Sequence, residues 1–143
     1  MLVKQILKNK AGSVVTIKPG ASVTEAAEML AARRIGALVV SSDGETVQGI
    51  LSERDIVREL GKRGTACLSD TVEAVMTRSI YGCTPEDKAD NVLDTMTKRR
   101  FRHMPVMDGK RMIGVISIGD VVAARLAELQ LEKDALTGMI MGY

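Results

Sequence analysis

The sequence predicts an α+β fold, made of two copies of one strand-helix-strand-strand-helix unit that pack as a pseudo-two-fold pair. Three observations predict this fold. Short motifs recur about 66 residues apart, the apolar residues of both halves change from strand-like to helix-like spacing in the same order, and 143 residues suit two small units that share an interface.

Two pairs of motifs carry the repeat. Residues 35–40 (IGALVV) resemble residues 101–106 (FRHMPV), and residues 49–57 (GILSERDIV) resemble residues 114–122 (GVISIGDVV). The first pair lies 66 positions apart and the second 65, because the turn between the motifs is one residue shorter in the second copy. A repeat at nearly constant spacing indicates two copies of one structural unit.

The repeat divides the chain into two domains. The first is expected to span residues 1–66 and to include an N-terminal helix, and the second to span residues 67–143 and to end in an extended C-terminal helix. Residues 3–7 (VKQIL) also resemble residues 72–76 (VEAVM). A lone domain of this size would bury little surface, so we expect the two to pack together.

Each unit is expected to open with a short apolar strand, at residues 14–17 and at residues 80–83, that is followed by a proline. The next segment has apolar residues at helical spacing in both copies. Ser22 is expected to begin a capping box at the start of the first helix, and Asp87 to cap the second helix in a similar way.

Two strands joined by a glycine-containing turn come next. They are expected at residues 37–40 and 47–51 in the first unit, and at residues 104–107 and 112–116 in the second. A final helix closes each unit directly after the second of these strands.

The last helix is longer than the unit needs. Its helical pattern continues from residue 119 to about residue 136, with Val122, Leu126 and Leu129 on one face. This segment either lies back on its own domain or joins a second subunit. Because large exposed apolar patches usually mark interfaces, we expect a homodimer.

Composition and charge exclude several classes of partner. The net charge of +2, from 20 basic and 18 acidic residues, is too balanced to indicate a nucleic acid. Cys67 and Cys83 form no CxxC motif and no cluster with the single histidine, so no metal site is expected. Neither a signal peptide nor a membrane span of about 20 apolar residues is recognisable. We therefore expect a cytoplasmic protein without a membrane partner.

The tetrads Ser52-Glu-Arg-Asp55 and Ser117-Ile-Gly-Asp120 occupy equivalent places in the two units, where a strand ends and a helix begins. Serine with an acid three residues later is the pattern of a capping box, which needs no ligand. The same place also presents free backbone N–H groups that suit a phosphate, and a carboxylate there can accept hydrogen bonds from ribose hydroxyls. Both interpretations stay open at this point.

The duplicated unit, with GILSERD, VMT, RHMPV and GVISIGD in this order, resembles a tandem CBS-domain protein from Val3 to about Leu126. The domain is named for cystathionine β-synthase. The resemblance implies two clefts between the domains, in which the Ser…Asp tetrad of one copy faces strands of the other. It also implies an adenine-nucleotide ligand, with AMP as the first candidate and ATP, ADP or NAD(H) as others.

The resemblance also implies which residues bind. In one cleft Asp120 would bind the ribose and Ser117 would lie near the phosphate, with Val15, Gly36 and Ala37 at the adenine. The second cleft would use Ser52, Arg54, Asp55, Thr77, Tyr81, Arg102 and His103.

The second cleft departs from the family where Tyr81 and Gly82 replace the usual aliphatic-threonine pair. Within the basic run of residues 98–103, the first two cations suit the C-terminal end of a helix, whereas Arg102 and His103 are expected to bind phosphate. Since Arg54 falls in the same cleft, that cleft is expected to prefer the more highly phosphorylated or longer ligand.

We therefore expect a non-enzymatic regulatory module that senses an adenine nucleotide and couples its binding to conformation or to the control of another protein. No catalytic residue is expected, because His103 has no partner at suitable local spacing. A ligand-free dimerisation scaffold fits the same pattern. A nucleic-acid-binding protein would need more stacking aromatics than Phe101, and an enzyme of the barrel type would need about 250 residues.

Overall fold

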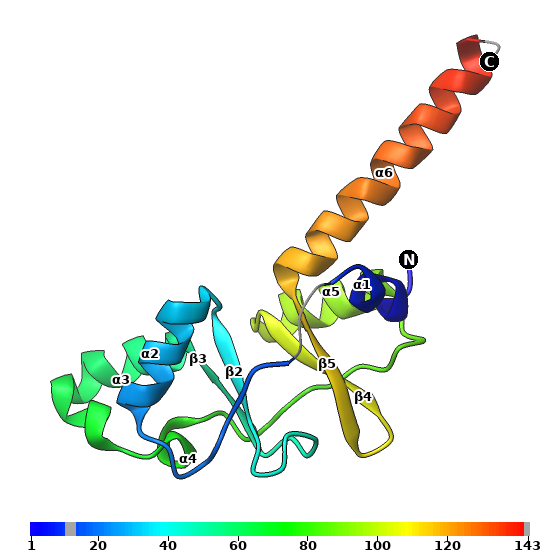
Figure 1. Cartoon of the computed structure of the whole chain (residues 1–143). Coiled ribbons are helices and arrows are strands. Elements are labelled where there is room, and N and C mark those ends of the chain that lie inside the picture. Colours follow the sequence, from blue (N-terminus) through cyan, green and yellow to red (C-terminus); the bar gives the residue numbers. More distant parts are fainter. Residues whose placement is uncertain (11–13, 142–143) are drawn as a thin grey trace.

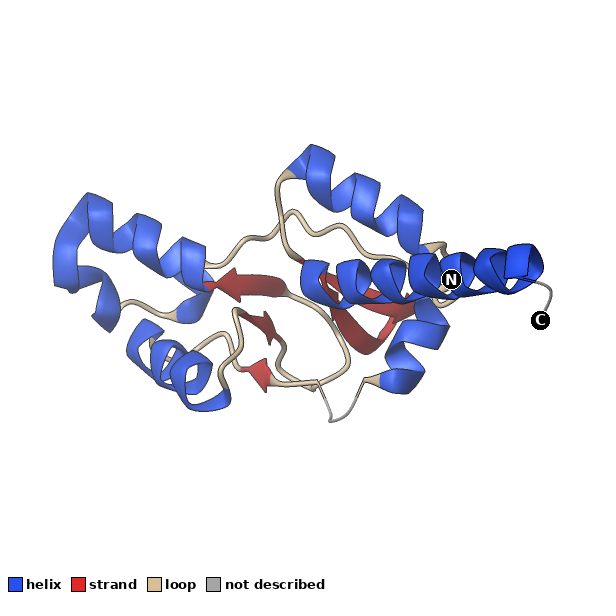
Figure 2. Cartoon of the chain, turned by 90° about the horizontal axis from the view of Figure 1, so that it is seen from above, coloured by secondary structure: helices blue, strands red, loops and turns tan. Residues whose placement is uncertain are grey.

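The computed structural model describes residues 1–10 and 14–141, and it confirms the predicted α+β fold of two repeated units. Figure 1 shows the two units beside each other, with one long helix that projects from the second, and Figure 2 shows the strands of both units toward the middle of the molecule. The first unit contains β1 (Thr16–Ile17), α2 (Val23–Arg33), β2 (Ala37–Val40), β3 (Gly49–Ser52) and α3 (Glu53–Arg63). The second contains α5 (Ala89–Arg99), β4 (His103–Asp108), β5 (Arg111–Ser117) and α6 (Ile118–Met141).

The sheet of the first unit has the order β1-β2-β3. β1 is parallel to β2, and β2 is antiparallel to β3. In the second unit β4 and β5 form the equivalent antiparallel pair. All four strands that the sequence places around the two turns are therefore present, although β3 begins two residues later than expected.

The strand expected at residues 80–83 is wrong. Only Cys83 pairs there, in an isolated parallel bridge with Val106. Cys83 donates to the carbonyl of Pro105 (3.0 Å) and accepts from Met107 (2.7 Å). The next bond of a parallel ladder would need an N–H from Pro105, which proline lacks, so the pairing stops at one residue.

The two helix caps also differ. The Ser22 hydroxyl accepts from the Glu25 N–H at 3.1 Å, so Ser22 caps α2 as predicted, but only this half of the expected capping box is found among the described contacts. Asp87 instead accepts from the Thr84 N–H at 2.8 Å, which closes the turn before α5. The expectation that Asp87 caps α5 is therefore wrong, since α5 starts after Lys88 without a side-chain cap.

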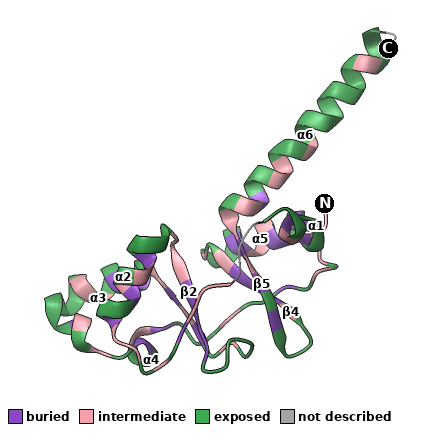
Figure 3. Cartoon of the chain, in the orientation of Figure 1, coloured by how far each residue is buried: buried purple, intermediate pink, exposed green. Residues whose placement is uncertain are grey.

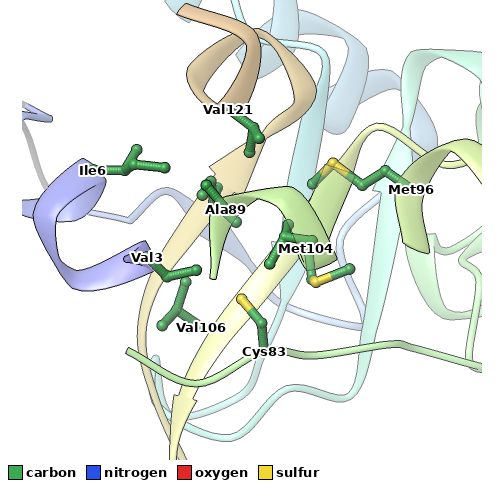
Figure 4. Close-up of a cluster of buried hydrophobic side chains, with 10 residues drawn as sticks. Val3, Ile6, Cys83, Ala89, Met96, Met104, Val106 and Val121 are labelled. Atoms are coloured by element: carbon green, nitrogen blue, oxygen red, sulfur yellow. The ribbon is translucent and has the colours of Figure 1, made fainter. Parts of the chain in front are cut away.

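Two short helices exchange places between the units. α1 (Val3–Asn9) contributes Val3 and Ile6 to the core of the second unit, where they pack with Ala89, Val106 and Val121 (Figure 4).

α4 (Val72–Val75) contributes Val72 to the core of the first unit, and the short 3₁₀ segment Gly64–Ser69 leads into it. Backbone bonds hold each exchanged helix, from Val3 to Asp87 O (2.9 Å) and from Val72 to Ala21 O (2.8 Å). Each of these two helices thus packs in the unit on the other side of the domain boundary expected between residues 66 and 67. The boundary itself stays a prediction.

α6 projects away from its own unit over most of its length (Figures 1 and 3). Its first part is held by the N-terminal ammonium, which pairs with Glu128 at 3.0 Å. Beyond that point it carries large apolar side chains in solvent, with Leu131 68 % and Met139 80 % exposed. The outer part therefore does not lie back on its own domain. None of the helices described in this chain is long and apolar enough to cross a membrane.

Candidate functional site

Two clefts lie between the units, and each is lined by residues of both. We call them the Asp55 cleft, of about 440 Å³, and the Asp120 cleft, of about 760 Å³. The residues that the sequence assigns to each binding site are brought together in the matching cleft. The Asp120 cleft holds Val15, Gly36, Ala37, Ser117 and Asp120, and the Asp55 cleft holds Ser52, Arg54, Asp55, Thr77, Tyr81, Arg102 and His103. Their roles in binding stay predictions.

Both Ser…Asp tetrads form capping boxes. Ser52 N–H donates to Asp55 Oδ2 at 2.9 Å, and Asp55 N–H donates to the Ser52 hydroxyl at 3.2 Å. Ser117 and Asp120 make the same two bonds, at 2.9 and 3.1 Å. In both boxes the backbone bond uses only the Oδ2 atom of the carboxylate. The cap therefore leaves the Oδ1 atom to other partners.

The two carboxylates differ in what surrounds Oδ1. Asp55 Oδ1 accepts from Arg58 (3.3 Å) and from the Thr77 hydroxyl (3.4 Å), and the Asp55 side chain is only 9 % exposed. Asp120 has a 27 % exposed side chain, and no residue within the described ranges donates to its Oδ1. Asp120 is therefore the more accessible acceptor.

Lys10 lies directly against Asp120 and was not singled out in the sequence. Its Nζ donates to Asp120 Oδ2 at 2.8 Å and to the Val115 carbonyl at 2.9 Å. Burial raises the pKa of Asp120, but the hydrogen bonds from Lys10 and Ser117 outweigh it, so the pKa lies below its usual value. The two residues are 110 positions apart, which is why no local pattern indicates the contact.

The Asp55 cleft is rich in arginine. Arg54 and Arg102 both line it, as predicted, and in the described part of the chain neither forms an ion pair, while Glu59 pairs with Arg63. Arg58 and Arg100 add two further guanidinium groups. Such forked donors match phosphate oxygens.

An aromatic stack lies at the same cleft. The rings of Tyr81 and Phe101 are 5.6 Å apart and nearly parallel, at 11°. The Arg99 guanidinium lies over the Tyr81 ring, with its carbon 4.4 Å from the ring centroid. The departure of Tyr81 from the family pattern thus has a structural counterpart, because it builds a cation–π contact at the edge of the cleft. Arg99, which was expected only to suit the C-terminal end of a helix, thus also contacts the Tyr81 ring.

Two equivalent arginines have an uncommon backbone. Arg34 (φ 54°) and Arg100 (φ 58°) end α2 and α5 in the left-handed conformation, where glycine is the usual residue. Arg34 lines the Asp120 cleft and Arg100 the Asp55 cleft. Both belong to an Arg-Arg pair that recurs 66 positions apart, at residues 33–34 and 99–100. This repeat was a usable sequence signal for two further cleft residues.

Gly36 and His103 line both clefts and meet between them. A Cβ atom on Gly36 would lie 3.2 Å from His103 Cε1, so a larger residue would crowd the imidazole. Burial lowers the pKa of His103, and the charge of Lys10 lowers it further. We therefore expect a neutral imidazole in this wall near pH 7.

The remaining reactive side chains indicate no further chemistry. Burial raises the pKa of the Cys83 thiol to about 12, and Cys67 is fully buried. Such thiols are poor nucleophiles. Over residues 1–10 and 14–141 no three His, Cys, Asp or Glu side chains gather in a way that could hold a metal ion.

Comparison with known proteins identifies the family. The CBS domain family model matches residues 3–62 and 72–127. The CBS domain-containing protein CBSX3, mitochondrial, of Arabidopsis thaliana is 34% identical over 148 residues, which cover 98% of this chain and 72% of the relative. The crystal structure of the CBS-domain containing protein ATU1752 from Agrobacterium tumefaciens is 42% identical, with a TM-score of 0.84, and the match covers 87% of this chain and 99% of that one.

Two similar structures contain adenosine derivatives. The CBS domain pair of protein MJ0100, in complex with 5′-methylthioadenosine and S-adenosyl-L-methionine, is 25% identical with a TM-score of 0.78, covering 90% of this chain and 98% of that one. CBSX2 in complex with AMP is 26% identical with a TM-score of 0.72, covering 88% and 96%. With both halves matched by the family model and the whole fold shared, this chain belongs to the CBS domain family as a tandem domain pair.

Proposed function

We propose that this chain is a non-enzymatic regulatory module that binds an adenine nucleotide, with AMP as the first candidate, in the clefts between its two units. One observation carries the proposal. Each cleft sets a Ser…Asp box at the start of a helix in one unit opposite residues of the other unit. A ligand in such a cleft touches both units at once.

The residues of the Asp120 cleft suit the parts of a nucleotide. Asp120 Oδ1 can accept a hydrogen bond from a ribose hydroxyl, and Ser117 lies at the start of α6, where backbone N–H groups favour a phosphate. Val15, Gly36 and Ala37 offer an apolar surface with little bulk, which suits the flat adenine. The AMP complex of CBSX2 supports this ligand class, and the complex of MJ0100 makes S-adenosylmethionine its main competitor.

The Asp55 cleft is proposed to take the ligand with more phosphates, such as ATP, ADP or NAD(H). Arg54 and Arg102 lie on opposite units and line the same cleft, so an extended polyphosphate could contact both. His103 would contribute as a neutral donor.

Ligand binding would be reported as a change in how the two units pack. A ligand shifts a conformational equilibrium only by its different affinity for the two states. Because the ligand contacts both units, it binds more tightly to the arrangement of the units in which the cleft is closed around it. We propose that this shift, transmitted to α6, controls a partner protein.

α6 is also proposed to form a homodimer interface. Val122, Leu126 and Leu129 are 41, 62 and 45 % exposed, which is unusual for side chains of this size in a row on one helix. A second copy would cover them with an identical face. The same observation supports the second candidate function, a dimerisation scaffold that binds no ligand.

The setting is proposed to be a reducing one, in keeping with the cytoplasmic location expected from the sequence. Cys67 and Cys83 are both free and buried, and neither is paired.

Thermal unfolding with AMP, ADP, ATP, NADH and S-adenosylmethionine tests the proposal. A ligand at 100 times its Kd stabilises the folded state by about 2.7 kcal/mol, which is a measurable rise in Tm. We expect AMP or another adenine nucleotide to raise the Tm. If none of the five does, the ligand-binding function is contradicted and the scaffold function remains.

A further inference from the structure

Lys10 is held at the Asp120 cleft by a helix that is fixed to the second unit. It directly follows the last residue of α1, and its N–H donates to the Leu7 carbonyl at 3.1 Å. α1 itself is anchored by the fully buried Val3. Leu7 packs so closely on Gly114 that a Cβ atom there would lie 2.8 Å from Leu7 Cδ2. The lysine is therefore placed beside Asp120 by a helix that packs into the core of the second unit.

Within residues 1–10 and 14–141, the Lys10 ammonium bonds to two acceptors and has a third N–H without a partner. An ammonium has three N–H groups, and two of them bond to Asp120 Oδ2 and to the Val115 carbonyl. The side chain is 40 % exposed and lines the Asp120 cleft. Beside it, Asp120 Oδ1 accepts no hydrogen bond from any described residue. A donor and an acceptor that no described residue occupies thus lie next to each other at one side of the cleft.

We propose that Lys10 is a specificity-determining residue of this cleft, and that Lys10 and Asp120 together recognise the two neighbouring hydroxyls of a ribose. This inference rests on the proposed function. The 3′-hydroxyl donates to Asp120 Oδ1, and the 2′-hydroxyl accepts from the third N–H of Lys10. Each hydroxyl can both donate and accept, so a vicinal diol satisfies both groups at once. A 2′-deoxyribose satisfies only one of them.

The other cleft provides the contrast. When α1 and α4 are aligned at their first residues, Val3 and Val72, the position that corresponds to Lys10 is Ser79. Ser79 lines the Asp55 cleft. There Asp55 Oδ1 is already bonded to Arg58 and Thr77. We therefore expect strong discrimination between ribose and deoxyribose at the Asp120 cleft and weaker discrimination at the Asp55 cleft.

Calorimetric titration with AMP and 2′-deoxyAMP tests the inference on the full chain. The Asp120 cleft is identified as the site whose affinity falls in Asp120→Ala. In the wild type we expect AMP to bind there about 10-fold or more tightly than 2′-deoxyAMP. Lys10→Met removes the ammonium at similar length, and we expect it to weaken AMP about 10-fold while changing 2′-deoxyAMP little. Lys8→Met, on the exposed side of the same helix, is the matched control and should bind as the wild type does.

Several results would overturn the inference. An equal loss for both nucleotides in Lys10→Met would make Lys10 a general attractor of anions, and tighter AMP binding would make it an internal competitor for Asp120. If the wild type binds AMP and the ratio of the affinities for AMP and 2′-deoxyAMP is the same in Lys10→Met, only this inference is contradicted. A wild type that binds neither nucleotide defeats the proposed function as well. If Lys10→Met does not fold, Lys10→Arg replaces it, and this variant should keep the preference for AMP.

Discussion

Replacing Asp120 with alanine separates the two roles that its carboxylate can have. The substitution removes the acceptor of the Ser117 N–H, which is a capping bond of 2.9 Å. Loss of such a cap costs about 0.5–2 kcal/mol of stability. It also removes the partner of Lys10, whose side chain is 40 % exposed and can be rehydrated, so this ion pair adds at most about 1 kcal/mol. We expect the protein to remain folded.

The expected loss of nucleotide affinity is separate and larger. A hydrogen bond to a charged group contributes about 1.5–3 kcal/mol, so Asp120→Ala should weaken AMP binding about 10–150-fold. Asp120→Asn is the matched variant, because the amide oxygen can still accept from Ser117 while the charge is lost. It should keep most of the stability and still bind AMP weakly. Urea unfolding and calorimetry on both variants measure the two quantities. If stability falls while AMP affinity stays unchanged, Asp120 is only a cap and the reasoning is refuted.

Three further predictions concern other parts of the molecule. Arg34→Gly should raise the free energy of unfolding by about 0.5–1 kcal/mol, measured by urea unfolding, because glycine adopts the left-handed conformation without the strain that arginine bears. A less stable variant would show instead that the Arg34 side chain stabilises the fold. Arg102→Ala should lower the affinity for ATP more than that for AMP in calorimetry, whereas two equal sites in the wild type would contradict the assigned difference between the clefts. Leu126→Lys with Leu129→Lys should turn a dimer into a monomer in light scattering, and a wild type that is monomeric at micromolar concentration would contradict the dimer.

The fold could be predicted because the repeat supplies the same information twice. The strand pairs and both closing helices follow from motifs that recur with one residue missing in a turn. The expected strand at residues 80–83 failed because periodicity reports apolar side chains and not backbone donors. Pro105, which was visible in the motif, removes the donor that this strand would need. At residues 80–83 the backbone constraint therefore outweighs the apolar side-chain pattern.

The grouping of the cleft residues could be predicted only through the resemblance to a family. Nothing in the spacing of Gly36 and Asp120 indicates that they face each other across two units. The resemblance did not indicate the contact between Lys10 and Asp120, which joins the N-terminal helix to the second unit. The exchange of α1 and α4 between the units creates that contact, and such an exchange leaves no local trace in the sequence.

A helix cap and a contact to a ligand are compatible on one carboxylate. A carboxylate has two oxygens and about four lone-pair positions. At both boxes the cap uses Oδ2, so the start of the helix is fixed whether or not a ligand is present. The repeats differ at the other oxygen. Arg58 and Thr77 donate to Oδ1 of Asp55, whereas no residue in the described part of the chain donates to Oδ1 of Asp120. The proposed difference in ligand between the two clefts therefore needs no change in the capping boxes, because the residues around Oδ1 can differ without disturbing the cap.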